Sequence, residues 1–167
     1  MNDTILGNFV ATVDRGEIEA GKLAVSKARS SAVKAYARTM IDAHTKDLAL
    51  TTRLLRGNGL ATMDSSSNAA APASGGDLVA DTKAQHQQVM TQLRDATGDA
   101  FDRVYMDAMV AGHQDVLVKL EMHAGGASLA PVTSHLAAVQ KAVTDHLARA
   151  KEVQLKLSAV AATQPRD

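Results

Sequence analysis

The sequence contains no cysteine, few aromatic residues and no excess of charge of either sign. Among its 167 residues the only aromatic ones are Phe9, Phe101, Tyr36 and Tyr105. Without cysteine there is no disulfide, no thiolate metal site and no cysteine nucleophile, and the redox compartment stays open. Lys plus Arg and Asp plus Glu both number 18, so no basic field attracts nucleic acid or an anionic membrane surface. We therefore expect no nucleic-acid partner.

Long hydrophobic runs and an export signal are also missing. No stretch approaches 18 consecutive apolar residues, so we expect no membrane span. The opening residues MNDT lack the charged and apolar regions of a secretion signal, as would a mature chain cut from an exported precursor. The length predicts one domain, over residues 1–167, with an aliphatic, Ala-rich core.

Helical periodicity runs through most of the chain. Apolar residues recur at a spacing of 3.6 in five segments, which predict helices over residues 4–28, 31–56, 77–96, 99–124 and 128–161. Ser30-Ser31, Asp77 and Asp99 are the expected N-caps of the second, third and fourth helices, and Gly57-Asn58-Gly59 is the expected stop of the second. Residues 57–76 are rich in small side chains and predict a mobile crossover. The predicted fold class is all-α.

The lengths of the connections predict how the helices are arranged. Three of the connections are short, so the helices that they join are expected to be antiparallel. The third helix is long enough to carry the chain back along the bundle, which would make the second and fourth helices parallel. Four long helices in up-down-down-up order, with an extra crossover helix, are typical of a ferritin-like bundle.

Polar residues interrupt the apolar stripes near the middle of the helices. His44, His86, His113 and His146 each fall in register with apolar neighbours, and Glu17 is the polar residue nearest the stripe of the first helix, with Asp14 placed off it. A weak repeat relates residues 16–20 to 112–116 and His44 to His146, which would bring Glu17, His44, His113 and His146 to one depth. This donor set suits a transition-metal ion such as Zn, Fe, Ni or Cu rather than Ca or Mg. The predicted metal ligands are Glu17, His44, His113, His146 and His86.

Other interpretations of the same residues stay open. The inward histidines could be hydrogen-bonded core residues of a structural or interaction module that meets its partner through exposed helix faces or the crossover. Met40, Met90 and Met109 each lie four residues from a histidine, which would suit Cu(I), but methionine more often fills gaps in a helical core. Asp99, Asp102 and His123 are expected to complement helix dipoles, and His135 lies about three turns from His146.

Signatures of common enzymes are absent. The sequence has no glycine-rich phosphate loop, no G-x-S-x-G and no H-E-x-x-H. A di-iron carboxylate bundle expects Glu three residues before its histidines, but Ile41, Lys83, Val110 and Val143 occupy those places. Ferroxidase and oxygenase chemistry are therefore disfavoured, and the sequence leans away from an enzyme.

Four segments resemble the bacterial domain of unknown function 4142 family: GEIEAGKLA (16–24), VKAYARTMIDAHTKDL (33–48), QHQQVMTQLRDATGDAFDRVYMDAMVAGHQ (85–114) and DHLARA (145–150). The resemblance implies a ferritin-like bundle that is usually exported, hence periplasmic or otherwise extracytoplasmic, and it supplies no established activity. The residues that match the family pattern are Glu17, Glu19, His44, His86, Phe101, Asp102, Tyr105, His113 and His146.

The chain departs from that pattern in three places. Ala43 and Gly112 stand where an acidic residue often precedes the histidine, and Gln140-Lys141 replaces a common Leu-Pro pair. The carboxylates that would orient metal-bound histidines are thus missing from the expected positions. Our leading hypothesis is an extracytoplasmic ferritin-like bundle that binds one transition-metal ion for metal handling or stress protection.

Overall fold

The protein is built from long α-helices. The structure, a computed structural model, describes residues 2–63 and 76–163 and contains no strand in them. The helices are α1 (Asp3–Lys27), α2 (Ser31–Gly57), α3 (Gly76–Asp95), α4 (Gly98–His123) and α5 (Ala130–Thr163), with a 3-10 turn η1 (Ala124–Gly126) before α5. The all-α prediction is confirmed, and the predicted helix ends lie within about two residues of the observed ones. The mobility predicted for the crossover falls largely on residues outside the described ranges.

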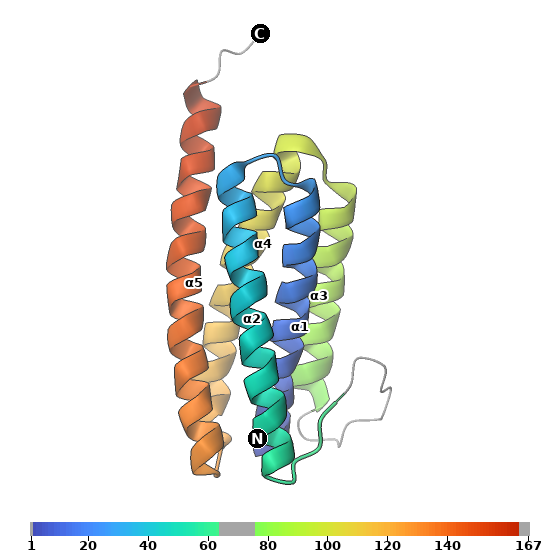
Figure 1. Ribbon diagram of the computed structural model, residues 1–167, viewed down its shortest axis with the longest axis vertical. Coiled ribbons are helices and arrows are strands. Elements are labelled where there is room, and N and C mark those ends of the chain that lie inside the picture. Colours follow the sequence, from blue (N-terminus) through green and yellow to red (C-terminus); the bar gives the residue numbers. More distant parts are fainter. Residues whose placement is uncertain (1, 64–75, 164–167) are drawn as a thin grey trace.

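Successive helices alternate in direction along the long axis, so that α2 and α4 run the same way (Figure 1). Helix α1 packs against α2, α3 and α4, and α5 packs against α2 and α4. Contacts thus link α1, α2, α5 and α4 in a ring, while α3 covers the side formed by α1 and α4. None of the described helices is long and apolar enough to cross a membrane.

The ends of the first two helices follow from local capping. The side chain of Asn2 accepts a hydrogen bond from the backbone N–H of Ile5 at 3.0 Å, and Ser30 caps α2 as predicted. At the far end of α2, Gly59 has a φ of 68° and the N–H of Leu60 donates to the carbonyl of Leu55 at 2.9 Å. A positive φ favours glycine, so the predicted stop is confirmed.

Two buried aspartates hold the short connections. Asp102 on α4 accepts hydrogen bonds from the backbone N–H groups of Arg29 at 3.0 Å and Ser30 at 2.7 Å, where α1 turns into α2. Asp3 on α1 does the same for Ser128 at 3.0 Å and Leu129 at 3.1 Å, before α5 begins. The Ser128 hydroxyl donates to Asp3 as well, at 2.6 Å. Each connection is therefore fixed by a helix of the other hairpin.

The prediction for the start of α4 was wrong in two respects. Its N-cap is Thr97, which makes no side-chain capping bond, and Asp99 lies inside the first turn. Asp102 is buried and binds the α1–α2 connection, so it does more than complement the helix dipole. The pattern of one helix cannot show this contact, because the acceptor and the donors are about 70 residues apart.

Three glycines let other helices approach α1 closely. A Cβ at Gly7 would lie 2.6 Å from Leu55 of α2, and one at Gly16 would lie 2.7 Å from His86 of α3. One at Gly21 would lie 2.8 Å from Ile41. Helix α1 is consequently buried on more than one stripe, and the prediction that Asp14 lies off the buried face was wrong: Asp14 is 2% exposed.

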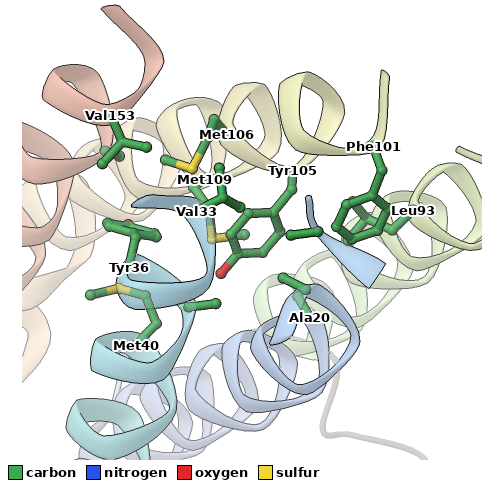
Figure 2. Packing of buried hydrophobic residues seen from close by; sticks show 14 of the residues in the cluster. Ala20, Val33, Tyr36, Met40, Leu93, Phe101, Tyr105, Met106, Met109 and Val153 are labelled. Carbon is green, nitrogen blue, oxygen red and sulfur yellow. The ribbon is translucent and has the colours of Figure 1, made fainter. Parts of the chain in front are cut away.

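A polar layer divides the hydrophobic core into two clusters. The first contains Tyr36, Met40, Tyr105 and Met109, which point toward one another in Figure 2. The second, nearer the start of α1, contains Phe9, Val10, Val116 and Val143. Between them along the helices lie Asp14 and Glu17 on α1, His44 on α2, His113 on α4 and His146 on α5.

Candidate metal centre

Three histidines from three helices meet in the polar layer. His44, His113 and His146 each offer a ring nitrogen, and these nitrogens all lie within 4.8 Å of one another. The ring centroids are 5.2 to 6.1 Å apart and the rings meet edge to face. Each histidine follows the 3.6 periodicity of its helix, which is why all three point into the bundle.

Hydrogen bonds orient two of the rings. Nδ1 of His113 donates to the backbone carbonyl of Met109, one turn earlier in α4, at 2.8 Å. Nδ1 of His44 lies 2.8 Å from Oδ1 of Asp14 on α1. With Nδ1 as the donor, Nε2 of each neutral ring carries a free lone pair. Such a bond from the second ring nitrogen to a carboxylate or carbonyl is typical of metal-binding histidines.

The inner ring nitrogens have no hydrogen-bond partner among the described residues. These atoms are Nε2 of His44, Nε2 of His113 and Nδ1 of His146. The other buried side-chain atoms without a partner there are Oδ2 of Asp14, Oε2 of Glu17 and the hydroxyl oxygen of Tyr105. Buried polar atoms are nearly always paired, so this concentration of unpaired atoms in and beside one layer sets the layer apart from the rest of the described core.

Burial and mutual proximity shift the pKa values of the layer. Burial raises the pKa of Asp14 to about 7, although its hydrogen bond to His44 acts in the opposite direction. Burial lowers the pKa of His44, but the hydrogen bond to Asp14 and the charge of Glu17 outweigh it, so the net shift is upward. Burial, with His44 and His113 beside it, lowers the pKa of His146 to about 4. His146 is therefore neutral at neutral pH, while the pKa values of Asp14 and His44 are both shifted upward.

Glu17 lies in the layer but outside the group of three histidines. Its charge contributes to the raised pKa values of Tyr36 and Tyr105, where burial is the larger cause. Oε1 would be 3.9 Å from a Cβ at Gly112, so Glu17 faces α4. The carboxylate is near enough to influence His44 electrostatically.

The remaining histidines lie elsewhere. His86 on α3 places Nε2 3.3 Å from Oε2 of Glu19, and its ring packs over Gly16. The structure therefore does not bring this predicted ligand to the other three. His135 bonds the hydroxyl of Thr51 at 2.7 Å, and His123 lies in the last turn of α4.

Asp14 is the site residue that the sequence did not predict as inward-facing. The first half of α1, residues 5–13, is apolar or small on almost every side. A helix that is apolar all round is a buried helix, which indicates that burial near Asp14 extends beyond a single stripe. The apolar surroundings of residues 5–13 thus indicate the burial of Asp14, which a single apolar stripe does not.

The sequence was also compared with known proteins. The family model described as Domain of unknown function (DUF4142) matches residues 3–153. The chain belongs to this family. No curated protein and no solved structure was found to match the chain.

The DUF4142 motifs noted in the sequence now have positions in the structure. His44, His113 and His146 form the histidine cluster, and Glu17 lies in the same layer. Glu19 and His86 join α1 to α3, and Asp102 holds the α1–α2 connection. Phe101 and Tyr105 are buried in the first core cluster, so the motifs divide among the polar layer, two contacts between helices and the hydrophobic core.

Proposed function

We propose that this DUF4142 protein binds one transition-metal ion, such as Zn, Fe or Cu, through His44, His113 and His146. The observation that carries the proposal is the convergence of three imidazoles whose inner nitrogens are buried and unpaired within the described residues. Imidazole is the donor that these metals favour, and the protein has no cysteine to compete. His86 is left out of the ligand set because it pairs with Glu19.

The charges around the histidines favour a cation. Asp14 and Glu17 each have a buried carboxylate oxygen without a partner in the described part of the chain. Burying a carboxylate oxygen without a partner is costly, and a divalent ion near the layer would offset part of that cost. Glu17 enters the proposal as a neighbouring carboxylate that the metal could recruit, and Asp14 as the group that orients His44.

The spacing of the nitrogens suits a site that contracts on binding. Ligand nitrogens around tetrahedral zinc, about 2.1 Å from the ion, lie roughly 3.4 Å apart. The nitrogens of the three histidines lie within 4.8 Å of one another, so no pair needs to close by more than about 1.4 Å to reach that spacing. With the Nδ1–H of His44 donating to Asp14, Nε2 of the neutral ring is free to bind the ion, and a doubly protonated His44 must first lose its Nε2 proton.

We further propose a ferritin-like arrangement of α1, α2, α4 and α5 and a role outside the cytoplasm in metal handling or stress protection. The ring of contacts among these four helices and the parallel course of α2 and α4 support the arrangement. Export of other DUF4142 proteins suggests the location, which fractionation of cells that express the complete gene product would test.

Thermal melting of protein purified without a metal-affinity tag tests the metal site. With metal at about 1,000 times its dissociation constant we expect the melting temperature to rise by about 10 °C over chelator-treated protein. The variants His44→Ala, His113→Ala and His146→Ala should each lose that rise and the bound metal, whereas His123→Ala should keep both.

A parent melting temperature that is the same with chelator and with Zn, Fe(II) or Cu would overturn the proposal. The histidines would then be a hydrogen-bonded structural layer, for which the bonds of His44 to Asp14 and of His113 to Met109 already provide part of the pairing. In that case the protein would be a structural or interaction module.

A further inference from the structure

A cavity reaches the histidine cluster from the side where α2 and α5 meet. Its volume is about 160 Å³, and His44, His146 and Asp14 line it. Lys46 and Leu50 also line it and are exposed, whereas Asp14 and His44 are buried. The cavity therefore extends from the surface to two of the three proposed metal ligands.

The lining of this cavity is mainly apolar. The apolar side chains in its wall include Phe9, Val10, Val116, Val139 and Val143. An apolar cavity of about this volume can hold a small apolar molecule such as xenon or benzene. The ionisable side chains in its wall besides the histidines are Asp14, Asp47 and the exposed Lys46, which give no excess of positive charge to attract an anion.

A second cavity offers a useful contrast. It measures about 340 Å³, lies among α1, α3 and α4, and is lined by Glu17, His86 and several glutamines. None of the three clustered histidines lines it. The smaller cavity is thus the one that leads to the imidazoles, although the other is larger and more polar.

Three protein ligands leave a coordination position open. Metal sites with three protein ligands keep a further position for water or an exogenous ligand. Two of the three imidazoles face the smaller cavity, so a molecule in the cavity lies beside the metal. Its apolar wall disfavours a charged ligand and leaves room for a small neutral one.

We propose that this cavity admits a small uncharged diatomic molecule, of the class of nitric oxide and dioxygen, to the open position of the metal. The inference rests on the proposed metal site. The step is coordination alone, in which the diatomic takes the open position on the ion and no group is transferred.

Nitric oxide binding to the Fe(II)-loaded protein, kept free of oxygen, tests the inference. Ala43→Leu and Ala142→Leu place larger side chains in the cavity wall, at a half-buried position of α2 and at an exposed position of α5. Ala35→Leu and Ala138→Leu make the same change at exposed positions of the same helices away from the cavity. Metal content is measured first for every protein, and the iron–nitrosyl signal is followed by electron paramagnetic resonance.

We expect the parent and the two control variants to form the nitrosyl with equal affinity and equal metal content. The two filled variants should hold the same metal but bind nitric oxide about tenfold more weakly or worse, a loss of about 1.4 kcal/mol, because the added side-chain atoms take up space that the ligand needs. Azide, an anion, should bind more weakly than nitric oxide. Xenon NMR of metal-free protein should show the cavity occupied in the parent and blocked in the filled variants.

The outcomes separate the two proposals. If the parent holds no metal, the proposed function fails and this inference fails with it. If it holds iron but forms no nitrosyl, or if the filled variants bind nitric oxide like the parent, only this inference fails. Azide binding without nitric oxide binding would also overturn it.

Discussion

The hairpin α1–α2 and the hairpin α4–α5 hold each other in the same way but contribute differently to the site. Asp3 of the first hairpin binds the α4–α5 connection, and Asp102 of the second binds the α1–α2 connection. Asp14 follows Asp3 by eleven residues, and His113 follows Asp102 by eleven residues. These equivalent positions carry a carboxylate in one half and an imidazole in the other.

This comparison shows how a repeated scaffold can carry an asymmetric site. The second helices of the two hairpins each supply one histidine, His44 and His146. Of the first helices, one supplies the third histidine and the other supplies the carboxylate that orients His44. Aligning the hairpins on Asp3 and Asp102 pairs Asp14 with His113. Aligning them on Gly16 and Gly112 pairs Glu17 with His113 instead, so the two alignments differ by three residues.

Removing the two connecting carboxylates should have the largest effects on stability. Asp102→Ala and Asp3→Ala each leave two backbone N–H groups without an acceptor, and we expect each to lower the free energy of unfolding by about 2–3 kcal/mol. Urea unfolding measures both, with Asp99→Ala, an exposed position, as the control. A large loss in one variant and none in the other would show that the two hairpins are not held alike.

Asp14→Asn should weaken metal binding while leaving the fold intact. Loss of the carboxylate that orients a metal-bound histidine typically costs 10- to 100-fold in affinity, and we expect a change of about that size. Asp42→Asn is the matched control, because it makes the same change at an exposed position of α2 that does not line the cavity beside the histidines. Isothermal titration of both variants decides the matter, and an unchanged affinity in Asp14→Asn would remove Asp14 from the site.

The two glycines that appeared to be equivalent in sequence should respond in opposite directions. Gly16→Ala would push against the His86 ring, so we expect it to cost about 1–2 kcal/mol. Gly112→Ala meets only Glu17 Oε1 at 3.9 Å and should gain about 0.5–1 kcal/mol from helix propensity. Thermal unfolding compares them, and combining Gly16→Ala with His86→Ala should recover part of the loss. Equal effects at both glycines would contradict this account.

The smallest expected effect is on the pH dependence of the free energy of unfolding, to which His146 on α5 and Asp14 on α1 contribute with opposite signs. The pKa of His146 is lowered to about 4, so its contribution to stability is present above pH 6.5 and is lost as pH falls toward 4. The pKa of Asp14 is raised to about 7, so its contribution is present below its ordinary value near 4 and is lost as pH rises toward 7. In metal-free protein the two therefore oppose each other between pH 4 and 6.5.

Urea unfolding at pH 4.5 and 6.5 separates these contributions. Relative to the parent, His146→Gln should become more stable at the lower pH, and Asp14→Asn should become more stable at the higher pH. Because His146 is only partly buried, we expect a difference of about 1 kcal/mol for that variant. Shifts of the same sign in both variants would contradict the assigned protonation states.

Much of the helical structure could be read from the sequence alone. The apolar period of 3.6, Ser30 and Gly59 define α1 and α2 because caps and turns depend on a few neighbouring residues. The same period directed His44, His113 and His146 inward, since a helix fixes which residues share its face. For these residues local geometry and the final environment agree.

Tertiary structure alone decided the environment of Asp14, His86 and Asp102. The period of one helix describes its own face, but burial of Asp14 depends on α2, α3 and α4 surrounding α1. Whether His86 joined the other histidines depended on where α3 packs, and its position against Gly16 gave it Glu19 as a partner. Asp102 found its donors about 70 residues away. Contacts of this kind arise only when separate helices are brought together, so periodicity within one segment cannot specify them.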